Sequence, residues 1–384
     1  MIKNAVAIII LFFIIISAGC KKNYLDIMAV TGATPLALSE SVPADVELKF
    51  DGMVKRNYVF SSDALEAIAS TRVRVHEISP EGKFLGTYAY TGIPLNNLLE
   101  GIAPSPLDWK ENSKIDRIKS SLDKKMPGIK EEKRFHPTDI LVTFYSRDGK
   151  TAHFSYAELT FSDDRNPVIL AYHRKELKSG KDADKYNKNT YKDNIKGLRL
   201  VCPDDSDTSR YLNDVIKITY STLPAPDSLL PVVKSFKEIK SGKKCYSESI
   251  KGIDGNRAFS INLNEYQIKK VNRWVRFSHG HGFENIYSAE GISFRDILRK
   301  NFPNINLNDF FLVTGCDGYR VLLSCREIFD NADGESFLII KKLGNGFPPG
   351  RLMFSAVKDF YSDSNVWGVT NIVRLKLTAE KLAK

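Results

Sequence analysis

Two stretches of the sequence repeat one unusual junction, and this repetition limits the folds that are open to the chain. Residues 90–101 read YTGIPLNNLLEG, and residues 288–300 read SAEGISFRDILRK. In each stretch an extended lead-in meets a Gly-Ile step, after which apolar residues recur at helical spacing. A glycine at such a step permits a sharp strand-to-helix corner or the close approach of another backbone. We therefore expect one structural unit to occur twice.

Further segments of the two halves match in the same order. The pairs are GMVKRNYVF at 52–60 with GIDGNRAFS at 252–260, VRV at 73–75 with VRF at 275–277, RDGK at 147–150 with CDGY at 316–319, SYAEL at 155–159 with SCREI at 324–328, VILAY at 168–172 with FLIIK at 337–341, LRLV at 198–201 with GRLM at 350–353, and VIKITY at 215–220 with IVRLKL at 372–377. An ordered set of this kind indicates an internal duplication with two domains.

The positive charge of the chain lies mainly in two insertions in the first half. The formal net charge is +10, and lysine-dense tracts at 110–134 and 174–196 hold much of the excess. Both tracts are interleaved with Asp, Glu, Asn and Ser and lack regularly spaced aromatic residues. Such tracts are typical of solvated surface, so no nucleic-acid partner is expected, although an anionic partner remains compatible with the charge.

The first twenty residues indicate export and attachment to a lipid. Lys3 precedes an uncharged apolar run at 5–16, which is too short to span a bilayer and has the length of a signal-peptide core. The small residues at 17–19 lead directly to Cys20, a pattern that resembles the lipobox of bacterial lipoproteins. The resemblance implies that Cys20 is acylated and holds the exported chain on an envelope membrane. The alternative is a short membrane anchor with an incidental cysteine.

These patterns divide the chain into five segments. They are a signal peptide at 1–19, a lipidated tether at 20–45, a first domain at 46–225, a connector at 226–248 and a second domain at 249–384. Within each domain the sequence predicts several strands and a few short helices, without regular alternation of the two. That pattern favours α+β or mostly β domains over a doubly wound sheet. The Asp-Gly pairs, which separate apolar or alternating runs, predict two hairpins.

The matched segments of each domain also follow one another in a recognisable order. It comprises a strand, Y-x-G-I-P-L-x-x-L-L, a strand, an Asp-Gly hairpin, x-L-x-E-L, a buried strand, G-L-R-L-V-x-P and a closing strand. This order resembles the molybdopterin-binding domain of the sulfite-oxidase class of oxidoreductases, over about 48–222 and more loosely over about 249–378. The resemblance implies two tandem copies of a mixed, β-rich α+β fold around a molybdenum-pterin cofactor, with a cysteine thiolate on the metal.

The resemblance implies a set of cofactor-binding residues. They are Arg74, Tyr90, Arg199, Arg276, His279 and Arg351. Arg199 and Arg351 match the family's arginine after the late glycine-rich turn, and Arg74 and Arg276 match each other across the halves. For each arginine the alternative is a strand cap or a solvent-facing side chain, and for Tyr90 it is simple packing.

The sequence departs from the family at the metal ligand. The family's cysteine lies between the early strand and the Gly-Ile junction, but the intervals at 76–91 and 278–290 contain no cysteine. Hard ligands do not replace a soft thiolate, so no molybdenum ligand and no catalytic residue are predicted. His279 and His281 share one side of an extended segment and can ligate a metal, although a polar glycine-rich loop is the alternative.

The remaining cysteines and acidic residues do not restore a catalytic site. Cys202, Cys245, Cys316 and Cys325 allow three full pairings. A bond between Cys316 and Cys325 is not expected, because a hairpin turn at 317–318 places them roughly 20 Å apart. Free buried thiols are expected for some of the four. The aspartates at 163–164 and 204–207 are hard-cation ligands by type but lack a regular ligand spacing.

Two hypotheses about function follow. In the first, an exported lipoprotein of the molybdopterin-oxidoreductase class holds a pterin or another anionic cofactor and passes electrons to a redox partner. In the second, a duplicated relative without the cofactor is a non-catalytic binding or scaffold module of the cell envelope. The missing thiolate favours the second hypothesis.

The lipobox predicts that Cys20 carries the lipid. Radiolabelled palmitate should enter the chain expressed in a bacterial host and should not enter the Cys20→Ala variant, which should also leave the membrane fraction. Cys245→Ala, which keeps the lipobox, is the control. Label in the Cys20→Ala variant, or its retention in the membrane fraction, would contradict the assignment.

Overall fold

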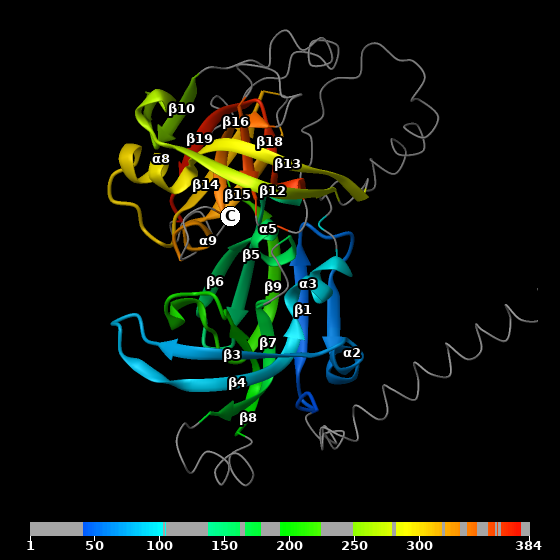
Figure 1. Ribbon diagram of the computed structural model, residues 1–384. Coiled ribbons are helices and arrows are strands. Elements are labelled where there is room, and N and C mark those ends of the chain that lie inside the picture. Colours follow the sequence, from blue (N-terminus) through cyan, green and yellow to red (C-terminus); the bar gives the residue numbers. More distant parts are fainter. Residues whose placement is uncertain are drawn as a thin grey trace, which may run out of the picture. The chain divides into compact units, whose positions relative to one another are not determined.

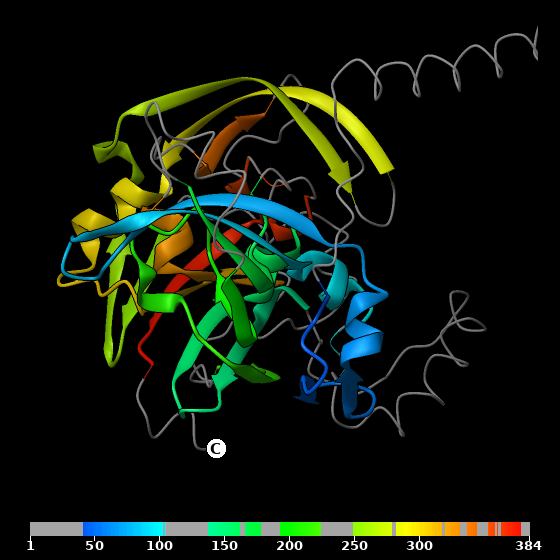
Figure 2. The same ribbon diagram turned by 90° about the horizontal axis from the view of Figure 1, so that it is seen from below.

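The computed structural model of the chain describes residues 41–102, 104, 137–161, 166–177, 193–223, 249–278, 282–316, 319–330, 336–343, 352–357, 359 and 362–377. From Val42 onward the chain forms one compact unit (Figures 1 and 2). The predicted signal peptide, nearly all of the predicted tether and connector, and most of the two lysine-dense tracts lie outside the described residues. The lipid attachment of Cys20 therefore stays a prediction.

The first half contains two sheets. One has the strand order β2-β1-β9-β5-β6 and the other β3-β4-β7-β8. Their strands are β1 (Glu47–Gly52), β2 (Tyr58–Ser61), β3 (Thr71–Ile78), β4 (Phe84–Pro94), β5 (Ile140–Ser146), β6 (Thr151–Ser155), β7 (Ile169–Glu176), β8 (Asp193–Val201) and β9 (Val215–Thr222). β1 pairs antiparallel with β2 and parallel with β9, so the strand that closes the half lies at the centre of its first sheet.

The second half repeats this order of strand pairing. Its sheets are β11-β10-β19-β14-β15 and β12-β13-β16-β17-β18. Their strands are β10 (Ile250–Asp254), β11 (Arg257–Ile261), β12 (Ile268–Ser278), β13 (Gly282–Ser293), β14 (Phe310–Gly315), β15 (Arg320–Ser324), β16 (Phe337–Leu343), β17 (Met353–Ala356), β18 (Val366–Trp367) and β19 (Val369–Leu375). β10 pairs antiparallel with β11 and parallel with β19, as β1 does with β2 and β9. The exact domain boundaries given above stay predictions.

The α+β fold class predicted from the sequence is wrong. The described residues form nineteen strands but only five α-helices, which are α2 (Ser62–Glu66), α3 (Leu95–Glu100), α5 (Tyr156–Thr160), α8 (Phe294–Asn301) and α9 (Cys325–Phe329). Each helix has five to eight residues, one or two turns, which is too short to form a helical layer. The described part of the chain is mostly β. The prediction of a sulfite-oxidase-type α+β fold is therefore wrong as well.

Short 3-10 helices and the described α-helices connect the strands. The 3-10 helices are η1 (Pro137–Asp139), η2 (Thr208–Arg210), η4 (Leu263–Glu265) and η5 (Ser362–Ser364). The longest α-helix, α8, has eight residues. Within the described residues no helix has the length and apolar character needed to cross a membrane.

Both Gly-Ile junctions form the predicted corner between strand and helix. β4 leads into α3 and β13 leads into α8, and the strand register shifts at Gly92 and at Gly291. A Cβ atom on Gly92 would lie 2.4 Å from the carbonyl oxygen of Leu170, and one on Gly291 would lie 2.8 Å from that of Ile339. The expected close approach of another backbone is therefore confirmed at both glycines.

The two predicted hairpins are confirmed by the strand pairing. β5 pairs with β6 across Asp148 and Gly149, and Gly149 has a φ of +83°. β14 pairs with β15 in the same way, although the turn residues at 317–318 lie outside the described residues. The positive φ at Gly149 is the conformation for which an Asp-Gly turn is suited.

Each half has its own apolar core, and a third apolar cluster draws on both halves. In the first core, Phe50 and Phe144 of one sheet pack with Leu170 and Leu200 of the other. A separate apolar core fills the second half, with Ile292, Phe311 and Phe354 among its buried residues. The third cluster joins Leu141 to residues of the second half, which are Ile253, Phe310, Leu312, Leu322, Val373 and Leu375. The halves are therefore in direct apolar contact.

We expect Gly92→Ala to destabilise the protein by about 1–3 kcal/mol, because the added methyl group meets rigid backbone atoms of β7. Gly101→Ala is the control, since a Cβ atom there would lie 3.5 Å from its nearest neighbour, and its effect should stay within about 0.5 kcal/mol. Urea unfolding of both variants measures the difference. Equal stability of the two variants would contradict the close approach at Gly92.

Candidate functional site

The structure brings together only two of the described residues that the resemblance implied. Arg74 lies on β3 with an exposed side chain and pairs in register with Ala89, so it points to the opposite face from the neighbouring Tyr90. Arg276 lies on β12, with its guanidinium carbon 5.0 Å from the ring centroid of Trp367. His279 and Arg351 lie outside the described residues. Tyr90 and Arg199 remain as neighbours.

Tyr90 and Arg199 meet at the buried carboxylate of Glu77. The Tyr90 hydroxyl donates to Glu77 Oε1 at 2.6 Å, and Arg199 Nη2 donates to the same oxygen at 2.8 Å. Arg199 Nη1 donates to Asn213 Oδ1 at 2.8 Å. The guanidinium carbon lies 5.7 Å from the Tyr90 ring centroid and 5.6 Å from that of Tyr211. Both terminal nitrogens of Arg199 are thus occupied within the protein.

This arrangement is an internal ion pair and not an open anion site. The side chains of Glu77 and Arg199 are 5% and 16% exposed, so the pair is largely removed from water. Burial raises the pKa of Tyr90, and the Glu77 carboxylate raises it further, against the opposing charge of Arg199. The tyrosine therefore stays protonated and acts as a hydrogen-bond donor. An anionic cofactor would compete with Glu77 for the same guanidinium.

The described thiols do not fit a metal-binding role. Cys202 and Cys325 are free and buried, as predicted for some of the cysteines, so the absence of a bond between Cys316 and Cys325 is confirmed. Burial raises the pKa of both free thiols, which disfavours the thiolate that a metal requires. Cys316 is disulfide-bonded, and its partner lies outside the described residues.

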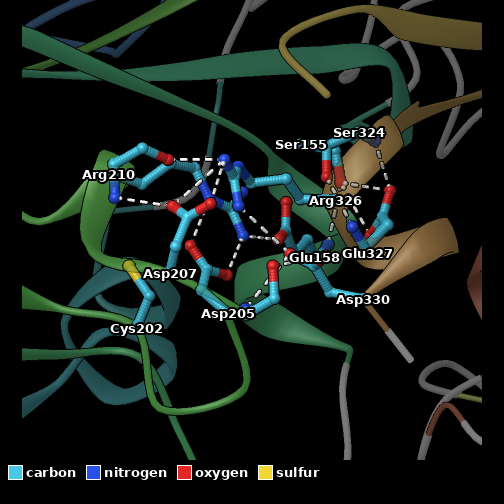
Figure 3. Close-up of polar contacts among 12 residues, drawn as sticks. Ser155, Glu158, Cys202, Asp205, Asp207, Arg210, Ser324, Arg326, Glu327 and Asp330 are labelled. Carbon is cyan, nitrogen blue, oxygen red and sulfur yellow. Dashed lines mark hydrogen bonds and ion pairs between the residues drawn. The ribbon is translucent and has the colours of Figure 1, made fainter. Parts of the chain in front are cut away.

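A cluster of charged side chains that the sequence did not predict joins the two halves (Figure 3). We call it the inter-half cluster, and its members are Ser155, Glu158, Asp205, Asp207, Ser209, Arg210, Ser324, Arg326, Glu327 and Asp330. Members up to residue 210 belong to the first half, and the others belong to α9 and its flanking residues. Both arginines of the cluster are buried, as are Ser155 and Ser324, so the pairing of the arginines matters for stability.

Arg210 neutralises two carboxylates of its own half. Its Nη2 donates to Glu158 Oε1 at 2.8 Å and to Asp205 Oδ1 at 2.5 Å, while Nε donates to Asp205 Oδ2 at 2.8 Å. The bond pair to Asp205 is the bidentate geometry that arginine favours with carboxylates. The guanidinium carbon also lies 4.1 Å from the ring centroid of Phe154. Arg210 therefore ties α5 to the segment that contains η2.

Arg326 extends the network across to the first half. Its Nη2 lies 2.5 Å from Ser209 Oγ and 3.3 Å from Asp207 Oδ1, both in the first half. Its Nη1 lies 3.2 Å from Asp330 Oδ2 in the same half. Asp330 in turn accepts a hydrogen bond from Ser206 Oγ at 3.0 Å. Each half thus donates at least one hydrogen bond to the other, and the ion pair of Arg326 with Asp207 also joins the halves.

The matched segments SYAEL and SCREI meet in this cluster. Ser155 caps α5 and accepts from the backbone nitrogen of Glu158 at 2.9 Å, and Ser324 caps α9 and accepts from that of Glu327 at 3.0 Å. The Glu327 carboxylate accepts from the backbone nitrogen of Ser324 at 2.6 Å, which completes a capping box. The Ser155 hydroxyl donates to Glu327 at 3.3 Å, so the first-half cap is bonded to the second-half cap.

The carboxylates in and near the inter-half cluster differ in how much nearby positive charge offsets their burial. Burial raises the pKa of Glu327, and the nearby charges of Glu158 and Asp359 raise it further. Burial also raises the pKa of Glu158, but Arg210 opposes this shift. Burial raises the pKa of Asp359 to about 7, although the Ser364 hydroxyl donates to it at 2.6 Å. Deprotonation of Glu327 therefore places a further negative charge among carboxylates.

A cavity of about 300 Å³ borders the cluster. Its lining residues are Thr151, Ala152, His153, Ser209, Arg210, Leu307, Asn308, Phe310, Ser324 and Leu377. Burial lowers the pKa of His153 to about 4, so the imidazole is neutral at neutral pH. The charge of Arg210 is already balanced by Glu158 and Asp205. This volume lies at the lower end of the range for ligand pockets. Because His153 is neutral and Arg210 is already paired, the cavity suits a small polar molecule without strong charge.

The described residues contain no group of three or more His, Cys, Asp or Glu side chains placed to hold a metal ion. Asp205 and Asp207, which the sequence offered as hard-cation ligands, are paired with Arg210 and Arg326 instead. Asp163 and Asp164 lie outside the described residues. The acidic run is therefore used for structural ion pairing in the part that the structure describes.

Comparisons with known proteins do not identify the chain. No protein-family model matches the sequence, and no curated protein matches it. Among solved structures it is similar to the sulfane dehydrogenase SoxCD from Paracoccus pantotrophus, with 11% sequence identity over 87% of this chain and 79% of that chain. The TM-score of this match is 0.29, which is too low to support a conclusion about this chain.

The raised pKa of Glu327 predicts a specific pH dependence of stability. Between the pKa of a glutamate in the unfolded chain, about 4.3, and the higher value in the folded protein, the folded state binds more protons. The contribution of Glu327 to the stability of the folded protein should therefore fall as the pH rises above about 4.3. Glu327→Gln keeps an oxygen that accepts from the Ser324 nitrogen, but its side chain does not titrate. The variant should therefore be more stable than wild type at pH 8 and lose that advantage at pH 4.

Thermal unfolding between pH 4 and pH 8 measures this difference. Glu66→Gln removes an exposed carboxylate from α2 and is the control, for which we expect no change in the pH profile. If Glu327→Gln unfolds with the same pH dependence as wild type, the carboxylate of Glu327 is not perturbed as described.

Proposed function

We propose that the chain is a lipid-anchored protein of the bacterial cell envelope that is related in sequence pattern to molybdopterin-dependent oxidoreductases. In this proposal its body is a non-catalytic binding or scaffold module that does not carry the cofactor. The observation that carries the proposal is the pairing of Arg199 with Glu77 and Asn213. The described arginine that best matches a cofactor-binding position is already neutralised by the protein.

The cysteines and arginines in the described part of the chain do not fit a molybdenum-pterin group. Such a group needs a thiolate on the metal and free cationic groups for its phosphate. Burial raises the pKa of Cys202 and Cys325, and Arg199 and Arg210 are held by internal carboxylates. No step of a redox reaction is therefore assigned to these residues.

The way the halves are joined supports the role of a binding module. The ion pair of Arg326 with Asp207, that of Arg320 with Asp139 and an apolar cluster around Leu141 hold the two halves together. A body fixed in this way presents its surfaces in a constant arrangement, which is what a scaffold requires. The cavity beside Arg210 and His153 is the proposed place for a small polar ligand.

Elemental analysis tests the proposal against the oxidoreductase hypothesis. The full chain is purified in detergent from a bacterial host grown with excess molybdate, and molybdenum and extractable pterin are measured per mole of protein. We expect both to be far below one per chain. A known molybdenum enzyme from the same host, purified in parallel, shows that the cofactor was available.

Stoichiometric molybdenum in the wild-type protein would overturn the proposal. In that event Cys202→Ser and Cys325→Ser identify the thiol that binds the metal, because the variant that lacks the ligand loses the molybdenum. Retention of stoichiometric molybdenum in both variants would place the ligand among the residues outside the described part of the chain.

A further inference from the structure

The β3–β4 hairpin carries an exposed apolar tip. We call this hairpin, residues 71–94, the basic arm; its strands form a long pair whose closed end extends beyond the neighbouring strands in Figure 1. At the start of β4, directly after the turn, Phe84 is 61% exposed and Leu85 is 45% exposed. Single exposed apolar side chains are common, but two adjacent large ones at the end of an arm indicate an interaction site.

The turn that presents this tip is well ordered by its own hydrogen bonds. The backbone nitrogen of Ser79 donates to the carbonyl of Lys83 at 2.8 Å, and that of Gly82 donates to the carbonyl of Ser79 at 2.8 Å. Gly82 has a φ of +81°, which a glycine adopts without strain. The ring of His76 lies 6.4 Å from that of Phe84, between centroids. The two apolar side chains therefore follow a turn that is closed by backbone hydrogen bonds.

The exposed charges behind the tip are mainly positive and unpaired. Arg72, Arg74 and Lys83 have exposed side chains, and none of the three forms an ion pair with the described residues. Glu81 is the one exposed carboxylate of the arm, and the Ser79 hydroxyl lowers its pKa. The Glu77 carboxylate is buried and held by Arg199. An anionic surface would therefore meet more cations than anions on this arm.

The second half has an equivalent arm that differs in charge. Phe283 on β13 pairs in register with Phe277, as Phe84 pairs with Ile78, and it is 60% exposed. On this arm Lys270 lies 4.0 Å from Glu290, and Lys342 of the neighbouring strand β16 lies 3.7 Å from the same carboxylate. The exposed phenylalanine is common to both arms, whereas among the described side chains the unpaired positive charge is found on the first arm.

We propose that the basic arm docks on an anionic lipid surface, the membrane that holds the predicted lipid at Cys20. The inference rests on the lipid anchoring proposed above. The compact body begins at Val42, and the 21 residues between Cys20 and Val42 span at most about 75 Å when fully extended. The body therefore stays within reach of the bilayer. Phe84 and Leu85 enter the interfacial region, and Arg72, Arg74 and Lys83 contact the anionic headgroups.

Binding to lipid vesicles tests the proposal without the lipid anchor. The mature chain from residue 20, with Cys20→Ser, is mixed with vesicles of phosphatidylcholine alone or with added phosphatidylglycerol, and the bound fraction is measured by sedimentation. We expect binding to the anionic vesicles that weakens with salt. Phe84→Ser with Leu85→Ser, and separately Arg72→Gln with Arg74→Gln, should each weaken binding by about tenfold or more.

The equivalent arm supplies the matched control. Phe283→Ser with Ile286→Ser removes two side chains that are 60% and 55% exposed, and this variant should bind anionic vesicles as wild type does. Loss of binding in this variant with retention in the arm variants would overturn the proposal. So would a failure of the Cys20→Ser chain to bind anionic vesicles, or a change of self-association and not of vesicle binding in the arm variants.

The anchor and the arm can fail separately. Palmitate labelling tests the lipid at Cys20, and vesicle binding of the Cys20→Ser chain tests the arm. Vesicle binding without palmitate labelling would support the arm and contradict the lipid anchoring. Labelling without vesicle binding would support the anchoring and overturn the arm.

Discussion

The contacts of Arg326 with Asp207 and Ser209 of the first half are the interaction on which the arrangement of the protein depends. Each half has its own apolar core, so each could bury most of its apolar surface without the other. The contacts that fix one half against the other include the Arg326 guanidinium on Asp207 and Ser209, the ion pair of Arg320 with Asp139, and the small apolar cluster at Leu141. A buried charge without its partner is destabilising by about 3–5 kcal/mol. The pairing therefore favours this relative arrangement of the halves, because another arrangement would separate Arg326 from Asp207 and Ser209 and leave it with Asp330 alone.

The parts of the fold that the sequence predicted are those set by local chemistry. Gly92 and Gly291 were predicted as corners because only glycine allows the close backbone approach that the structure shows, and the Asp148-Gly149 pair was predicted as a hairpin for a similar reason. The fold class was wrong because apolar spacing indicates that a helix forms but does not fix its length. α3 ends at Gly101 after six residues, so the helices never form a layer.

The candidate site was less predictable because its partners are distant in sequence. Arg326 and Asp207 are 119 residues apart, and no local pattern links them. The pairing of Arg199 did leave a signal, which lies in the alternation of β3. Val73, Val75 and Glu77 occupy the buried positions of that strand, so a carboxylate stands where the pattern requires an apolar residue. A buried carboxylate needs a cation, and Arg199 supplies it.

The distribution of arginines then decides where an anion can bind. Inside the body, Arg199, Arg210 and Arg326 are each held by carboxylates, and Arg374 is held by Asp254 and Asp309. An anion that entered the body would have to displace a carboxylate that is already desolvated and well oriented, which is unfavourable. Arg72 and Arg74 on the basic arm are exposed and have no such competitor among the described residues. Among the described arginines, those of the basic arm are therefore better placed to meet an anion such as a lipid headgroup than the four that are held by carboxylates.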